Sequence, residues 1–269
     1  RHLIPMSAAV STLSSSTPSA PGWLHRALRH RSFVIGAVLS ALLILAALLS
    51  FVWTPWSPYE MDLANKLATP SGTHWLGTDA FGRDVASLLL VGARNSILVG
   101  VIAVGIGLTI GTALGLLAAA KRGWVEELIM RLADFTFAFP AILSAIMMTA
   151  VFGAGIVNSI IAIGIFNIPT FARVTRASAN AVWSREYILA SRACGKGSWR
   201  ITLEHVLPNI LSVLIVQATI QFAIAILAEA ALSYLGLGTQ PPQPSWGRML
   251  SEAQTLMFQA PLLAVWPGM

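Results

Sequence analysis

The sequence predicts an all-α protein that crosses a membrane several times. Hydrophobic residues make up 56% of the chain and charged residues only 10%, and the mean hydropathy is +0.73. Soluble domains carry about 25% charged residues. Apolar runs also recur along the chain, and roughly 20 apolar residues are enough for a helix to cross the hydrocarbon core of a bilayer. We therefore expect about six membrane-spanning helices.

The apolar runs give the expected position of each span. Five runs cover residues 33–52, 95–120, 128–149, 155–172 and 210–233. A sixth run begins near Pro261, only a few residues before Met269, so we expect the last helix to be truncated. Residues 1–22 are rich in Ser, Ala, Thr and Pro and lack periodicity, which predicts a disordered cytoplasmic tail. The run at 33–52 is too long for the apolar part of a signal peptide, so we interpret it as a membrane helix.

The distribution of basic residues predicts the orientation in the membrane. With a cytoplasmic N-terminus, thirteen of the 17 Lys and Arg residues lie on the cytoplasmic side. The net charge of +6 belongs mostly to that face, where lipid is the expected neighbour. A nucleic-acid-binding protein would instead carry its basic patch on a folded soluble module, so we exclude this class.

A polar, basic insert separates the fourth and fifth apolar runs. Residues 183–209 read WSREYILASRACGKGSWRITLEHVLPN. Good helix formers fill 186–193, Gly195 begins a turn, and an apolar pattern resumes at 201–207 and ends at Pro208. The pattern predicts a helix, a turn and a second helix at the cytoplasmic face.

The insert is either an ordinary solvated connector or a docking site, and its apolar content favours docking. A partner's cleft would bury the large side chains that a solvated loop does not need. They are Trp183, Tyr187, Ile188, Leu189, Trp199 and Ile201. The lone cysteine, Cys194, is expected to be a small packing residue without metal or thiol chemistry.

The spacing of Ala190, Gly195, Leu207 and Pro208 resembles the cytoplasmic loop of ABC importer permeases. Leu189 and Ser191 depart from the Glu and second Ala of that general pattern, and His205 replaces its Ile. The ending HVLPN is similar to the peptide and nickel branch of these permeases. The resemblance implies that this loop couples to an ATPase subunit through a short helix. The implied coupling residues are Glu186, Ala190, Ser191, Gly195, His205, Leu207 and Pro208.

Two further stretches, residues 74–100 and 229–252, are similar to C-type permeases of dipeptide and oligopeptide importers. The first lies in an expected outer-face segment, 53–94, and contains turn residues and charges in which Asp79 or Asp84 would hold Arg83. This motif is either a structural turn or a contact with a partner or peptide. Its residues are Gly77, Thr78, Asp79, Gly82, Arg83 and Asp84.

Several residues inside the expected spans are candidates for the pathway or for structure. Glu229 lies near the outer end of its run, where water would reach it, and either belongs to the pathway or caps the following loop. Pro140 and Pro169 are expected to interrupt the third and fourth spans and to frame a translocation path.

Packing positions are also predicted from spacing and residue type. Gly107, Gly111 and Gly115 share one helix face and predict close packing of that helix on a neighbour. Trp246 is expected at the membrane interface.

Taken over residues 23–269, the resemblance implies the type I ABC importer transmembrane domain. The implied function is that of a permease subunit forming half of a path for di- or oligopeptides across the cell membrane. The implied partners are a homologous second permease, one or two ABC ATPase subunits that bind ATP and Mg, and an extracytoplasmic peptide-binding protein. Residues 194–198 lack the spacing of a phosphate-binding loop, so we expect no cofactor, metal or catalytic residue on this chain.

Two alternatives remain open. One is a nickel importer permease of the same branch. The other is an ion-coupled secondary transporter, which would need acids at mid-membrane and inverted repeats.

Overall fold

The computed structural model describes residues 29–269, so the predicted disordered tail at 1–22 lies outside the described residues. The described residues divide into two units, one that ends at Leu43 and one that covers residues 44–269. Helix α2 (Arg31–Val52) runs across this boundary. The remaining elements belong to the second unit.

Throughout the described part of the chain the secondary structure is helical, apart from an isolated bridge between Thr78 and Asp84. After α2 come a 3₁₀ turn η1 (Leu63–Asn65), α3 (Val85–Lys121), α4 (Gly123–Ala138), α5 (Ala141–Phe152), α6 (Ile156–Trp183) and α7 (Glu186–Ala193). They are followed by α8 (Ser198–Ile201), a π-helical segment η2 (Thr202–Val206), α9 (Leu207–Tyr234), α10 (Trp246–Gln254) and α11 (Leu262–Gly268).

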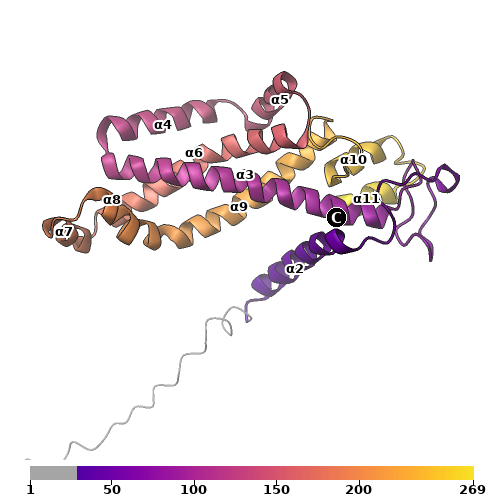
Figure 1. Ribbon diagram of the computed structural model, residues 1–269, viewed down its shortest axis with the longest axis horizontal. Coiled ribbons are helices and arrows are strands. Elements are labelled where there is room, and N and C mark those ends of the chain that lie inside the picture. Colours follow the sequence, from indigo (N-terminus) through magenta and orange to yellow (C-terminus); the bar gives the residue numbers. More distant parts are fainter. Residues whose placement is uncertain (1–28) are drawn as a thin grey trace, which may run out of the picture. The chain divides into compact units, whose positions relative to one another are not determined.

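Helices α3, α6 and α9 lie side by side and form the centre of the unit (Figure 1). Helix α4 packs along α6, and α5 contacts both α6 and α9. Helices α7 and α8 lie at one end of the bundle, called here the α7 end. Helices α10 and α11 lie at the opposite end, called the α10 end, together with the segment before α3.

Within residues 29–269, four helices are long and apolar enough to cross a membrane, or up to five if one bent pair counts as a span. The four are α2, α3, α6 and the continuous helix Ser198–Tyr234. The bent pair is α4 and α5, which meet at 84°. The expected sixth run produces α11, which has seven residues and is too short to span.

The two proline predictions have different outcomes. Pro140 stands at the break between α4 and α5 and precedes the first residue of α5, as expected for a residue that interrupts a span. The expectation for Pro169 is wrong, because α6 continues through this buried residue. Proline is tolerated within membrane helices that are packed against other helices, and α6 packs closely on α3 around this position.

The contact between α3 and α6 confirms the predicted glycine face. A Cβ atom on Gly107 would lie 2.4 Å from the Cβ of Asn167, and one on Gly111 would lie 2.5 Å from the carbonyl oxygen of Ile168. A Cβ on Gly115 would lie 2.6 Å from the carbonyl oxygen of Ala172. These distances are shorter than van der Waals contact, so the two backbones approach this closely only with glycine at all three positions.

Replacing Gly111 with Ala should therefore destabilise the protein by roughly 1–3 kcal/mol, because backbone rather than a flexible side chain would have to move. Gly105→Ala is the matched control on the same helix, since a Cβ atom on Gly105 would have no described atom within 4 Å beyond the adjacent backbone of α3 itself. Thermal unfolding in mild detergent measures the difference. Equal melting temperatures for the two variants would contradict the close α3–α6 contact.

Candidate functional site

Helix α7 forms the first half of the predicted helix-turn-helix, and its bounds are those predicted for the first helix. It ends at a turn in which Gly195 has φ +82°, while the Cys194 and Gly195 N–H groups donate to the carbonyls of Ala190 and Arg192. Among residues 29–269, no atom apart from those of Gly195 and its two chain neighbours lies within 4 Å of a Cβ built on Gly195. Glycine is therefore needed here for its left-handed backbone and not for space.

The second half of the loop differs from the prediction at Pro208. The helix does not end there, because Ser198–Tyr234 is one continuous helix and Pro208 lies in the first turn of α9. The π-helical segment η2 precedes it, with the Leu207 N–H donating to the carbonyl of Thr202. In a π-helical turn the N–H bonds to the carbonyl five residues back instead of four. Pro208, which has no N–H, comes directly after this change in pairing.

The six large apolar side chains of the loop divide into two groups. Trp183, Ile188 and Ile201 are buried within this chain, so the expectation that a partner buries them is wrong. Tyr187, Leu189 and Trp199 are 46%, 56% and 67% exposed. Cys194 is also exposed, contrary to the packing role expected for it.

His205 lies among polar side chains of the loop. Its Nε2 lies 3.4 Å from the Ser191 Oγ and 3.3 Å from the Lys196 Nζ, and its ring and that of Tyr187 make an edge-to-face contact. Lys196 also donates to Glu204 at 2.6 Å. Glu186, Ala190 and Pro208 are exposed, and Leu207 is half-buried. Glu204 and Lys196 were not singled out from the sequence, although their eight-residue separation across a turn is compatible with pairing.

At the α10 end, the outer-face motif folds back over the chain that precedes it. Gly77 and Gly82 have φ +82° and +75°, and a Cβ on either would overlap the backbone of Ala68 or Asp62. The Thr78 hydroxyl donates to the Asn65 carbonyl and accepts from the Ala68 N–H at 2.8 Å. The motif therefore forms a turn whose conformation depends on its two glycines and Thr78.

The ion pair in this motif is made by Asp79. Its carboxylate accepts the Arg83 Nε–H at 2.6 Å and the backbone N–H groups of Phe81 and Arg83. Asp84 has another role, because it accepts from the Ser87 N–H and hydroxyl and so caps the N-terminus of α3. The structure thereby decides between the two carboxylates that the sequence left open.

Arg83 also joins the motif to α10, a contact that sequence reasoning missed. Its Nη2 donates to Glu252 at 3.0 Å, and Glu252 accepts a second bond from Arg248 at 2.9 Å. Arg248 and Glu252 are four residues apart, a spacing that allows an ion pair on one helix to be recognised from the sequence. The bond to Arg83 bridges 169 positions, so no local pattern could reveal it.

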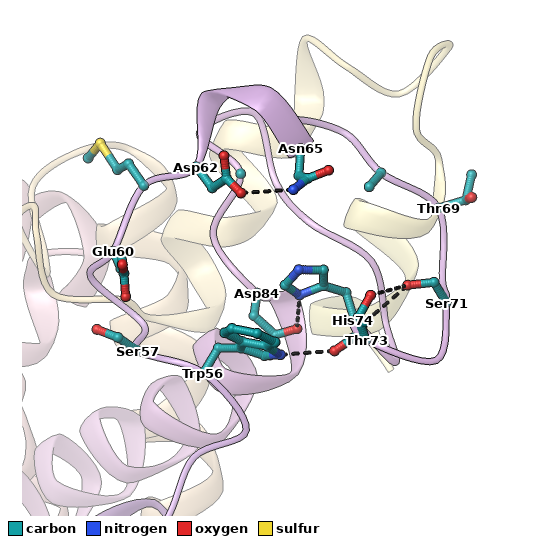
Figure 2. A pocket seen from close by; sticks show the side chains of 13 residues that line it. Trp56, Ser57, Glu60, Asp62, Asn65, Thr69, Ser71, Thr73, His74 and Asp84 are labelled. Carbon is teal, nitrogen blue, oxygen red and sulfur yellow. Dashed lines mark hydrogen bonds and ion pairs between the residues drawn. The ribbon is translucent and has the colours of Figure 1, made fainter.

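A cavity of about 770 Å³ lies beside this motif and was not foreseen (Figure 2). His74 stands between Asp84, which its Nδ1 approaches to 3.0 Å, and the indole of Trp56. The Trp56 Nε1–H donates to the Thr73 carbonyl. Glu60 and Asp62 also line the cavity, and hydrogen bonds from Asn65 and Ala64 lower the pKa of Asp62.

Glu229 is buried, so the expectation that water reaches it is wrong. Its carboxylate accepts hydroxyl hydrogen bonds from Ser96 of α3, Ser233 of α9 and Thr239 of the following loop. This geometry supports the loop-capping alternative, because one side chain ties two helices and the loop together.

Trp246 packs on α3. Its Nε1–H donates to the Leu89 carbonyl at 3.2 Å, and its ring covers Gly92. The Asn95 amide donates to the Pro244 carbonyl at 2.8 Å. The loop and α10 are thus fastened to α3 by polar contacts.

Gly82→Ala should destabilise the α10 end by roughly 1–3 kcal/mol, because a Cβ would lie 1.8 Å from the Asp62 carbonyl oxygen in a backbone conformation that alanine disfavours. Gly72→Ala is the control, since nothing surrounds its Cβ position. Limited proteolysis between residues 53 and 84 reports the effect. If both variants are cut at the wild-type rate, the packing described for the motif is incorrect.

Comparison with known proteins identifies the family. The model of the family "Binding-protein-dependent transport system inner membrane component" matches residues 111–269. A glutathione transport system permease protein of Pectobacterium atrosepticum is 39% identical over 259 residues, which cover 95% of this chain and 85% of the relative. A dipeptide transport system permease protein of Alkalihalophilus pseudofirmus is 41% identical over 240 residues, which cover 89% of this chain and 79% of the relative.

The fold also matches a solved transporter. The inward-facing MetNI methionine ABC transporter superposes with a TM-score of 0.56 at 20% identity, covering 66% of this chain and 88% of that chain. The predicted fold, the type I ABC importer transmembrane domain, is confirmed. The protein is a multi-pass membrane permease, and its chain belongs to the family of binding-protein-dependent transport system inner membrane components.

Proposed function

We propose that this chain is the C-type permease subunit of an ATP-driven importer and forms half of a translocation path for short peptides. The observation that carries the proposal is identity of 39% and 41% with permeases named for glutathione and dipeptide transport, over 95% and 89% of this chain. Glutathione is itself a tripeptide, so the two names describe one chemical class of substrate. The fold shared with an ABC transporter is consistent with this role.

The proposed assembly contains a homologous second permease, one or two ABC ATPase subunits and an extracytoplasmic peptide-binding protein. ATP and Mg would bind to the ATPase subunits. The support in this chain is the 183–209 loop, which places exposed Tyr187, Leu189 and Trp199 at the α7 end. Exposed aromatic and apolar side chains of this kind are typical contacts of a protein partner.

The α7 end is proposed to face the cytoplasm and the α10 end the outside. Basic side chains support this assignment, because Lys121, Arg122, Arg185, Arg192 and Lys196 all belong to the segments at or beside the α7 end. Segment 53–94, including the motif 77–84, would then meet the binding protein. The N-terminus would be cytoplasmic.

The alternatives have less support. The two relatives are named for glutathione and dipeptides, and neither name refers to nickel. A secondary transporter would need an acid free to exchange an ion at mid-membrane. Glu229, the carboxylate buried in α9, is already engaged by three hydroxyl groups near the end of its helix.

Purification of the intact complex from its native membrane in mild detergent tests the proposal. We expect a second permease, ATPase subunits and a peptide-binding protein to be identified by mass. Reconstituted in vesicles, the complex should take up a labelled dipeptide or glutathione only with ATP and Mg. A lone protein that moves solute on an ion gradient, or a complex that takes up nickel instead of peptide, would contradict it.

The single cysteine tests the orientation. Cys194 is exposed at the α7 end, so a membrane-impermeant maleimide should label it in inverted vesicles stripped of peripheral subunits and leave it unlabelled in intact cells. A Ser57→Cys, Cys194→Ser double variant should show the opposite pattern, because residue 57 lies in the segment before α3. Labelling of Cys194 in intact cells would reverse the assignment.

A further inference from the structure

A hollow of about 600 Å³ lies between α4 and α6, and it is called here the α4 hollow. Its size is in the range of small-molecule sites. Charged side chains make up most of its lining, and both signs are present. They are Glu126, Glu127, Arg131 and Asp134 of α4 and Arg176 of α6. Arg173 of α6 adds a further positive charge, because it pairs with Asp134.

The charges of the α4 hollow are arranged as neighbouring ion pairs. Arg176 donates from Nη1 to Glu126 at 2.9 Å, and Arg131 donates from Nη2 to Glu127 at 2.6 Å. A guanidinium carries five N–H donors, and these bonds use only some of them. Among residues 29–269, the Arg176 Nε has no hydrogen-bond partner. The arginines therefore keep donors available for another acceptor.

Helix α4 presents two exposed sides of opposite character. One side is apolar, with residues that recur every three or four positions, as on one face of a helix. It consists of Trp124, Leu128, Leu132 and Phe135. The other side carries the exposed charges Glu127, Arg131 and Asp134. The apolar side is suited to lipid, whereas the charged side is not.

The charged side continues into a part of α4 that belongs to a candidate span. Helices α4 and α5 together are apolar enough to cross a membrane as a bent pair. Asp134 comes eleven residues after Gly123, the first residue of α4, which places it about 16 Å along the helix. Charged residues inside spans face other protein or a water-filled path. Since Asp134 is exposed on this chain, its surroundings must be water or a second subunit.

We infer that the α4 hollow lines the aqueous path and contacts the charged ends of a peptide as it passes, with the carboxylate at Arg173 and the ammonium at Asp134. This inference rests on the proposed function. A free peptide carries both charges, and a guanidinium pairs well with a carboxylate. The Arg173–Asp134 pair is exposed, and exposed pairs are weak, so the peptide ends can replace the two partners at little cost. Weak contacts also allow release.

Cysteine labelling tests whether the hollow belongs to an aqueous path. Asp134→Cys and Leu132→Cys are each made in a Cys194→Ser background, and the complete complex is treated in inverted membrane vesicles with a charged, water-soluble maleimide. Asp134→Cys should be labelled and Leu132→Cys should not, because Leu132 lies at nearly the same depth on the apolar side. Both should label after denaturation, which shows that each thiol is present. Labelling of Asp134→Cys should also lower ATP-dependent peptide uptake several-fold.

A second experiment tests the contact with the peptide carboxylate. Arg173→Gln, Arg173→Lys and Lys121→Gln complexes are reconstituted in vesicles with saturating binding protein, and peptide uptake per ATP is measured. Arg173→Gln should lower uptake of a free peptide several-fold, and Arg173→Lys should restore most of it. Lys121→Gln removes a positive charge outside the hollow and should match the wild type. For a peptide with an amidated C-terminus, Arg173→Gln and the wild type should differ little, whereas a merely structural role would lower uptake of both peptides equally.

Equal aqueous labelling of Asp134→Cys and Leu132→Cys overturns the inference, as does wild-type uptake of free peptide by Arg173→Gln. An equal loss for free and amidated peptide also overturns it. If the binding protein does not deliver the amidated peptide, Arg173→Lys decides, and uptake as low as that of Arg173→Gln counts against the contact. Failure of the proposed function is distinct, because the wild-type complex would then show no ATP-dependent peptide uptake.

Discussion

The close approach of α3 and α6 is the interaction on which the rest of the bundle depends. Lipid tails are as apolar as the helices, so helix association in a membrane draws on van der Waals contact at short range rather than on expulsion of water. Gly107, Gly111 and Gly115 allow that contact because α3 carries no side-chain atoms at these three positions. Because α3 leads to the α10 end and α6 leads into α7, this one contact joins the two ends of the bundle (Figure 1).

The α10 end shows how polar groups are accommodated beside long apolar helices. A polar side chain without a partner is costly in such surroundings, and three buried carboxylates at this end have partners within the protein. Asp84 pairs with Ser87 and His74, Asp79 with Arg83, and Glu229 with three hydroxyl groups. The bond from Arg83 to Glu252 connects the motif before α3 with α10, and Glu229 connects α9 with α3. Residues far apart in the chain thus come together at the proposed outer face.

At the α7 end, some apolar side chains are buried against the bundle and others are exposed at its surface. Ile188 and Leu189 are similar in size and chemistry and adjacent in the chain, yet one is enclosed and the other is open. A helix that both joins two spans and presents an exposed surface is suited to carry motion between a partner and the bundle. This arrangement is the structural basis for the coupling role proposed for the 183–209 loop.

The sequence by itself determined the all-helical membrane class, the positions of the main spans, the first loop helix at 186–193 and the glycine face of α3. These properties follow from composition and from local periodicity, which are readable without knowledge of the neighbours. Only the tertiary structure decided that Asp79 rather than Asp84 holds Arg83, that α6 continues through Pro169, and that the helix beginning at Ser198 continues through Pro208. It also decided that Trp183, Ile188 and Ile201 face inward and that Glu229 is enclosed. In each case the outcome depends on contacts between residues distant in the chain or on which side of a short helix meets the bundle, and neither is encoded in local spacing.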